Sequence, residues 1–87
     1  MDKRTLTVTI KRPERSEFLG KASALTSINM RGQFDILPYH SNFITLIKDK
    51  VTVHLENKQP ITYSLQSGII KVSGDKVTVL IGIETHI

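Results

Sequence analysis

The residues best able to do chemistry in this chain are its three histidines, His40, His54 and His86. His54 and Glu56 form an H-x-E triplet, which zinc deaminases combine with paired cysteine ligands further along the chain. This sequence contains no cysteine, so the ligand set for such a zinc site is incomplete. Alternation along a strand simply places His54 and Glu56 on the same polar face.

A metal site built from distant residues is a second hypothesis. The three histidines could gather around a metal ion with Asp35 or Glu56, although nothing in their spacing requires it. The sequence has no G-x-S-x-G nucleophile elbow and no glycine-rich phosphate loop. We therefore expect no catalytic activity, no cofactor and no metal. A small metal-dependent enzyme of sandwich or cupin-like shape remains the alternative.

The chain is basic, and part of the excess is local. Twelve Lys and Arg against eight Asp and Glu give a net charge of +4. Basic residues near the start are Lys3, Arg4, Lys11, Arg12 and Arg15. A basic surface can meet nucleic acid, anionic lipid or an acidic protein surface. The simpler interpretation is an edge strand, because lysines there prevent sheets from pairing with one another.

Few aromatic residues are available to bind nucleic acid. Proteins that bind single strands need several exposed aromatic rings along a basic groove, because base stacking supplies much of the binding energy. Phe18, Phe34 and Phe43 stand among aliphatic neighbours and are expected in the core. Only Tyr39 and Tyr63 could serve as exposed platforms. A basic β-barrel that binds single-stranded nucleic acid therefore stays open as the alternative function.

Length and composition predict one small domain spanning residues 1–87. A chain of 87 residues buries only about 60 to 65% of its unfolded surface. Without cysteines it must be held by packing and strand pairing. No apolar run approaches the roughly 18 residues needed to cross a bilayer, and the first residues lack the apolar segment of a signal peptide. We expect a soluble, cytoplasmic domain.

The first half of the chain alternates with the period of two that is typical of strands. Leu6, Val8 and Ile10 alternate with threonines in a strand that Pro13 ends, and a second strand runs from Arg15 to Gly20. In the next segment one face is expected to be buried against the opposite layer. Its members are Ala22, Ala24, Thr26, Ile28 and Met30.

The second half starts with Gly32 to His40, GQFDILPYH, which predicts a strand and a turn fixed by Pro38. A strand follows over 41–47, and Asp49 with Lys50 predicts a tight connection. A hairpin over 51–66 and a strand opened by Gly68 come next. Val77, Val79 and Ile81 should form the most buried strand, since its second face is also partly apolar.

No segment has a helical period, so the predicted fold is all-β. Eight to ten short strands, with a turn signal every ten residues or so, indicate a small antiparallel β-sandwich or a flattened barrel. An open five-stranded barrel is the alternative that the periodicity leaves open.

Six motifs, in this order and spacing, resemble one family. They are K-R-P-E-R, F-L-G, R-G-Q-F-D-I-L-P-Y-H, F-I-T-L-I, Q-S-G-I-I-K-V and K-V-T-V-L. The chain resembles, over nearly its whole length, the N-terminal β-sandwich of the epsilon subunit of F-type ATP synthase. The resemblance implies a non-catalytic rotor subunit in the central stalk of a bacterial, proton- or sodium-translocating enzyme. It also implies the gamma subunit and the membrane c-ring as partners.

Further implications concern location and individual residues. The resemblance implies a peripheral position at the cytoplasmic face of the cell membrane, with membrane contact only through the complex, and no nucleic-acid partner. It places Arg31, Gln33 and Asp35 on the c-ring side. It places Arg12, His40 and Thr45 on the gamma side. The simpler interpretations are a turn histidine bonded to local backbone for His40, and a strand residue with its hydroxyl toward water for Thr45.

This sequence also departs from the family pattern. Asp35 and Tyr39 stand where the family usually has glycine, which predicts negative φ there, or an Asp in the left-handed region. Ser67 and Gly68 stand where the family has a pair of glycines, so position 67 departs from the pattern. Gln33 stands where an acidic residue is common in the family. The resemblance covers only the sandwich. It therefore implies neither the inhibition of hydrolysis nor the ATP binding that the family's C-terminal helical hairpin can provide.

Overall fold

The computed structural model describes residues 4–39 and 41–82, which form seven strands and no helix. The strands are β1 (Leu6–Arg12), β2 (Arg15–Ala22), β3 (Ala24–Asn29), β4 (Gly32–Ile36), β5 (Phe43–His54), β6 (Ile61–Ser73) and β7 (Lys76–Ile81). Within these residues, nothing helical is long and apolar enough to span a membrane. The prediction of an all-β fold is confirmed.

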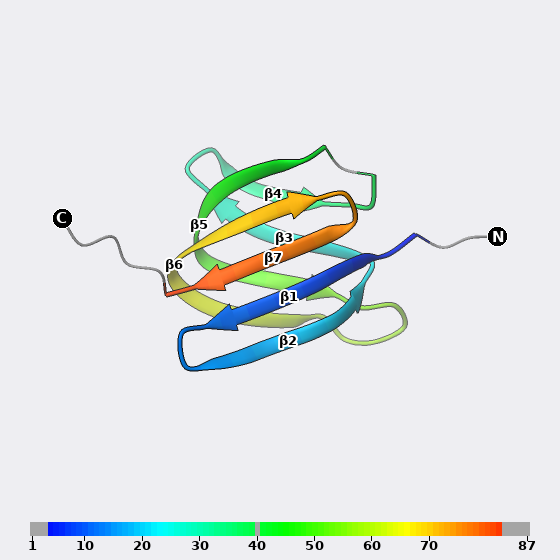
Figure 1. Cartoon of the computed structure of the whole chain (residues 1–87), viewed down its shortest axis with the longest axis horizontal. Helices are drawn as coiled ribbons and strands as arrows, with labels where there is room; N and C mark the ends of the chain where they lie inside the picture. Colours follow the sequence, from blue (N-terminus) through cyan, green and yellow to red (C-terminus); the bar gives the residue numbers. More distant parts are fainter. Residues whose placement is uncertain (1–3, 40, 83–87) are drawn as a thin grey trace.

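One hydrogen-bonded sheet with the order β2-β1-β7-β6-β5-β3-β4 folds over into two layers (Figure 1). The near layer consists of β2, β1, β7, residues 68–73 of β6 and residues 43–47 of β5. The far layer consists of the remaining halves of β5 and β6 with β3 and β4. The two layers make the predicted sandwich.

The strand count is lower than predicted because β5 and β6 each run through both layers. Asp49 does not end a strand. It lies at a bulge inside β5, where the pairing passes from Ile47 with Gly68 to Asp49 with Leu65. Asp49 has a φ of 71°, and such a bulge bends a strand without ending it. Asp49 and Gly68 therefore lie at bends inside β5 and β6. The sequence pattern could not distinguish such bends from the ends of strands.

Gly68 is the residue that permits the bend in β6. A Cβ atom at this position would lie 2.7 Å from the carbonyl oxygen of Leu80 on β7. That separation is too short for any side chain, since the contacting atom belongs to the backbone of the adjacent strand. Glycine at this position is thus required by the close approach of β6 and β7.

One strand pair differs from the antiparallel prediction. β1 and β7 run parallel, with Val8 beside Val77 and Ile10 beside Val79. The other described pairs are antiparallel. Parallel neighbours need a long connection, and here β2 to β6 provide it. The first and last described strands are thereby joined at the centre of the near layer.

The core lies between the layers and follows the predicted alternation. Its buried apolar members are Leu6, Val8, Ile10, Ala22, Leu25, Ile36, Ile47, Val51, Val53, Leu65, Ile70, Val72, Val77, Val79 and Ile81. The inward residues of β7 are buried, at most 2% exposed, but those of β1 are 0% exposed, so β7 is not the single most buried strand that was predicted. Phe18, Phe34 and Phe43 pack against this core while half-buried, and the last two rings meet edge to face with centroids 6.3 Å apart.

The predicted buried face between Ala22 and Met30 is wrong beyond Ala22. Strand β3 buries Leu25 and Ser27, while Met30 is 93% exposed. Ser23 forms a bend between β2 and β3, so the alternation restarts with the opposite parity. The buried Ser27 hydroxyl is satisfied, because it donates to the carbonyl oxygen of Lys50 at 2.8 Å.

Candidate partner-binding surfaces

Arg12, predicted on the gamma side, ties the two layers together at one end of the sandwich. Its Nε donates to Oε2 of Glu17 at 2.9 Å, and its Nη2 donates to the carbonyl oxygen of Ser64 on β6 at 2.9 Å. The second Glu17 oxygen accepts from Nε of Arg15 at 2.8 Å. Because its guanidinium is held by these bonds, Arg12 offers a partner mainly its apolar stem and one face.

The Arg12–Glu17–Arg15 cluster is charged at neutral pH. Hydrogen bonds from Arg15 and then Arg12 lower the pKa of Glu17, and their positive charges act in the same direction against the opposing effect of burial. The Tyr63 hydroxyl donates to the Glu17 carbonyl oxygen at 3.2 Å, and burial raises the pKa of Tyr63. Tyr63 is half-buried, so it does not provide the exposed stacking platform expected of it.

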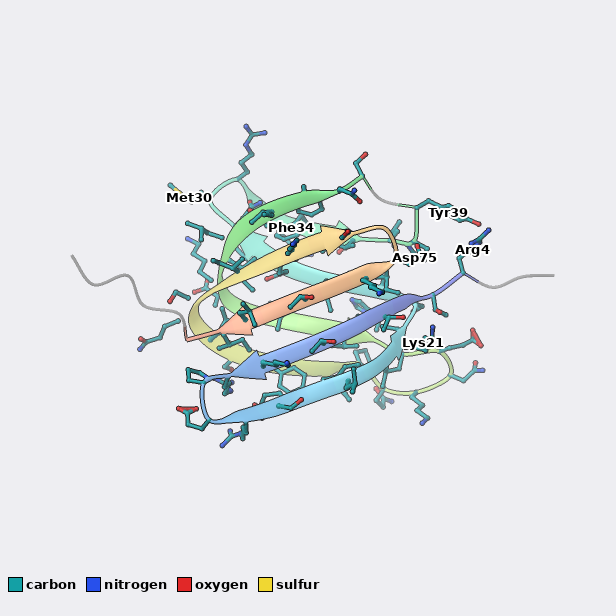
Figure 2. The ribbon with its side chains drawn as sticks, viewed as in Figure 1. Arg4, Lys21, Met30, Phe34, Tyr39 and Asp75 are labelled. Carbon is teal, nitrogen blue, oxygen red and sulfur yellow. The ribbon has the colours of Figure 1, made fainter. Side chains whose placement is uncertain are left out.

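The β3–β4 hairpin presents Arg31 at its tip. The backbone N–H of Arg31 donates to Oδ1 of Asn29 at 2.8 Å, and Gly32 takes a φ of 115°, which favours glycine. These two features fix the turn and leave Met30 and Arg31 exposed. In Figure 2 Met30 lies at the opposite end of the molecule from Tyr39 and Arg4.

Thr45, predicted on the gamma side, lies beside the same hairpin. Its Oγ1 accepts from Nδ2 of Asn29 at 3.3 Å and lies 3.3 Å from the carbonyl oxygen of Leu46. Thr45 is half-buried, and its hydroxyl contacts protein atoms, whereas the simpler interpretation had it facing water.

An open groove of about 290 Å³ lies between the hairpin and β5. It is lined by Asn29, Met30, Arg31, Ile44, Thr45 and Leu46. We call it the hairpin groove.

Gln33 and Asp35 extend the exposed strip from the hairpin tip along β4. Both side chains are exposed and share the outer face of the far layer, where Gln33 pairs with Ile28 and Asp35 with Thr26. The structure therefore brings Arg31, Gln33 and Asp35, the three residues predicted to face the c-ring, together on one hairpin.

His54 belongs to a polar ladder on the outer face of the far layer. Thr26 Oγ1 donates to Oδ1 of Asp35 at 2.6 Å and lies 2.8 Å from Nε2 of His54. Because the single hydroxyl hydrogen points to Asp35, His54 must donate from Nε2. Within residues 4–39 and 41–82, no three His, Asp or Glu side chains are grouped to hold a metal. His40 and His86 lie outside the described residues.

Tyr39 combines a left-handed backbone with an exposed ring. Its φ is 71°, so the expectation of negative φ at this position is wrong, whereas Asp35 lies in regular strand β4. The Arg4 guanidinium lies 4.9 Å from the Tyr39 ring centroid (Figure 2). This cation–π contact supports a ring that is 73% exposed.

An aliphatic row crosses the outer face of the near layer. Ile69 on β6 pairs with Leu46 on one side and with Leu80 on the other, and Leu80 pairs with Lys11 of β1. Leu46 is 65% exposed and its neighbour Ile44 is 67% exposed. We call Leu46, Ile69 and Leu80 the aliphatic row. The sequence does show apolar residues at these outward positions. In β7 they were interpreted as a second buried face of the strand, not as part of an exposed surface.

The aliphatic row connects two grooves. Leu46 lines the hairpin groove at one end. At the other end Leu80 lines a second open groove of about 240 Å³, together with Lys11, Arg12, Pro13 and Ile81. Arg12 and Thr45 therefore border the two ends of one continuous surface, although they lie on strands that are not neighbours.

The outer face of the far layer has a different character. Its outward positions carry mainly polar side chains, and Thr52 and Thr62 bond to each other there with their oxygens 2.9 Å apart. Solvated polar residues of this kind are the ordinary covering of a sheet that faces water. On the near layer, by contrast, the exposed aliphatic residues Leu19, Ile44 and Leu46 stand at outward positions.

Comparison with known proteins gives a consistent result. The family model of the ATP synthase delta/epsilon chain β-sandwich domain matches residues 5–83. The ATP synthase epsilon chain of Brevibacillus brevis is 30% identical over 76 residues, covering 86% of this chain and 58% of the relative. That of Clostridium botulinum is 32% identical over 81 residues, covering 90% of this chain and 59% of the relative. The chain thus spans under two thirds of these relatives' length.

Solved structures agree on the fold. A chain of the Euglena gracilis mitochondrial ATP synthase, in a structure of OSCP, F1 and c-ring, superimposes with a TM-score of 0.81 at 16% identity, over 88% of this chain and 50% of that chain. One from the Tetrahymena thermophila central stalk and c-ring gives 0.73 at 12% identity, over 93% and 66%. The match to the family model extends over nearly the whole sandwich. The chain belongs to the family of the ATP synthase delta/epsilon chain β-sandwich domain.

Proposed function

We propose that this sandwich is a non-catalytic part of the central stalk of a bacterial F-type ATP synthase and joins the gamma subunit to the c-ring. The observation that carries the proposal is the family match over residues 5–83. Relatives named ATP synthase epsilon chain and a similar fold in a central stalk and c-ring structure support it. In this role the domain is peripheral at the cytoplasmic face of the membrane and translocates no ion itself.

The β3–β4 hairpin is the c-ring side in this proposal. Arg31, Gln33 and Asp35 lie exposed along it, and Met30 projects from its tip. The turn is held by the Asn29 side chain and by Gly32, so the tip is ordered before it meets a partner. Preformed geometry lowers the entropy lost on binding.

The gamma side is the surface from the groove lined by Arg12 and Leu80 to the β5 wall of the hairpin groove, which Ile44, Thr45 and Leu46 form. Arg12 and Thr45 border its two ends, and the aliphatic row connects them. His40 remains a gamma-side prediction. Leu46 is exposed and Ile69 and Leu80 are half-buried. An aliphatic centre with polar side chains at the rim is the usual composition of a protein interface.

The mechanism is mechanical. A rotor contact must resist shear, and the sandwich is stiffened where its layers meet, by the bond from Arg12 to Ser64 and by the bond from Tyr63 to Glu17. The domain would hold gamma on the ring by static contacts and carry torque through its packed core.

Co-elution tests this proposal. The tagged chain is mixed at micromolar concentration with cognate gamma subunit and detergent-solubilised c-ring and passed through a size-exclusion column. We expect the chain to elute with the assembly. Elution of the chain alone would contradict the proposal. Retention by single-stranded oligonucleotide that falls steeply with salt would favour the nucleic-acid alternative instead.

A further inference from the structure

The outer face of the near layer carries lysines but no acidic side chain at an outward position of its described strands. The outward lysines are Lys11 on β1, Lys21 on β2, Lys71 on β6 and Lys76 on β7. Between them stand threonines, the aliphatic row and the exposed side chains of Leu19 and Ile44. Asp75 lies in the β6–β7 turn rather than on a strand, and both oxygens of Glu17 are bound by arginines.

Protection of a sheet edge can explain Lys21, which lies on the outermost strand β2, but not the other three lysines. Edge strands use lysine to prevent pairing with other sheets, and the sequence had suggested this for the basic N-terminal segment. In the structure the outermost strands are β2 and β4. Lys11, Lys71 and Lys76 lie on β1, β6 and β7, which are internal strands paired on both sides.

Two of these lysines, Lys11 and Lys71, border the aliphatic row, and Lys21 and Lys76 extend the positive face beyond it. Lys11 pairs with Leu80, one end of the row. Lys71 lies two residues after Ile69 on the same face of β6 and pairs with Ile44 of β5. Lys76 pairs with Thr7, whose hydroxyl also accepts from Nζ of Lys21 at 3.2 Å. An apolar centre surrounded by charges of one sign selects a partner whose apolar patch is surrounded by the opposite sign.

We infer that this face binds an acidic, aliphatic protein surface and that this surface belongs to the gamma subunit. The inference rests on the proposed function and adds the chemistry of the partner: carboxylates on gamma face Lys11 and Lys71, and aliphatic side chains of gamma cover Leu46, Ile69 and Leu80. Attraction between such surfaces acts mainly on the rate of association and is screened by salt.

Charge reversal with a matched control provides the test. Lys71→Glu changes the centre of the near-layer face. Lys50→Glu makes the same change on the outer face of the far layer, where Lys50 pairs with Ser64. Both lysines are exposed, so both variants should fold, and thermal melting of each is compared with that of the unmodified chain. Binding kinetics to immobilised cognate gamma are measured at low salt and at about 0.5 M NaCl, where the Debye length is roughly 4 Å.

We expect Lys71→Glu to lower the association rate constant by about 3- to 10-fold at low salt, with the difference shrinking at high salt, while Lys50→Glu stays close to the unmodified chain. Leu46→Ser, at an exposed position, should raise the dissociation rate without lowering the melting temperature. If gamma binds and the two lysine variants behave alike, the inference is overturned and the proposed function stands.

Other outcomes are also decisive. If the unmodified chain does not bind gamma at all, the proposed function fails and the inference fails with it. If vesicles of anionic lipid or a single-stranded oligonucleotide bind the chain through Lys71 while gamma binding ignores this residue, the face has a different partner and the inference is overturned.

Discussion

At the residue scale, Glu17 is the side chain whose environment has the clearest consequence for stability. Its carboxylate accepts from Arg12 and Arg15, and these bonds lower its pKa in the folded state. A carboxyl group with a lowered folded pKa stabilises the protein above its unfolded pKa of about 4.3. That stabilisation is lost as the pH falls through the folded value.

The first prediction is that Glu17→Gln destabilises the domain at pH 7 and that this loss disappears in acid. Urea unfolding at neutral pH and at a pH below about 3 measures both effects. Glu14→Gln, in the exposed β1–β2 turn, is the matched control and should show a smaller loss at pH 7. An equal loss for Glu17→Gln at both pH values would contradict the role assigned to the ion pairs.

Tyr39 shows how a residue can occupy a conformation that suits it poorly. Its φ of 71° costs about 1 kcal/mol or more for a residue with a Cβ atom. Strain of this kind persists where the surroundings or a function maintain it, and here Arg4 packs against the ring.

The second prediction compares two substitutions at this position. Tyr39→Ala and Tyr39→Gly both remove the contact with Arg4, but only glycine relieves the backbone strain. Tyr39→Gly should therefore be more stable than Tyr39→Ala by about 1 kcal/mol, measured by chemical denaturation. Equal stability of the two variants would indicate that the backbone at position 39 does not keep its positive φ in solution.

At the element scale, the bends of β5 and β6 make a sandwich out of one sheet. The third prediction concerns the bend in β6. Gly68→Ala puts a methyl group where it would lie 2.7 Å from the Leu80 carbonyl oxygen, so one strand must move, at a cost of about 1 to 3 kcal/mol.

Gly20→Ala is the control for this substitution. A Cβ atom at position 20 would be 3.4 Å from the nearest Phe18 ring atom, and a half-buried ring can adjust more easily than a strand backbone. We expect it to cost clearly less than Gly68→Ala in the same unfolding assay. If Gly20→Ala proves the more damaging of the two, the bend does not depend on the close approach of β6 and β7.

At the scale of the whole molecule, the sequence was sufficient to predict the kind of fold because alternation is a local property. Leu6, Val8 and Ile10 indicated their strand directly, and the inward residues of β7 indicated theirs. Asp49 and Gly68 were misinterpreted as breaks, because the same residue types allow a turn and a bulge. The parity of β3 depended on one bend at Ser23, which alternation alone does not reveal.

The candidate surfaces were harder to predict because they depend on which strands become neighbours. The motif from Gly32 to His40 indicated the family, and Arg31, Gln33 and Asp35 do share one hairpin. Nothing local indicated that β7 pairs with both β1 and β6, which places Leu80 beside Ile69 and Lys11. Nor did the sequence show that Arg12 is held by Glu17 and Ser64.

The central claim, that one domain holds gamma and the c-ring on two different surfaces, is tested most directly by site-specific cross-linking in the assembled rotor. A photoreactive residue replaces Met30 at the hairpin tip, Lys71 on the near-layer face or Lys50 on the far layer, all three exposed. We predict an adduct with the c subunit from position 30, an adduct with gamma from position 71, and none from position 50. Adducts with gamma from position 50 but not from position 71, or no adduct from any position in an intact assembly, would contradict this account.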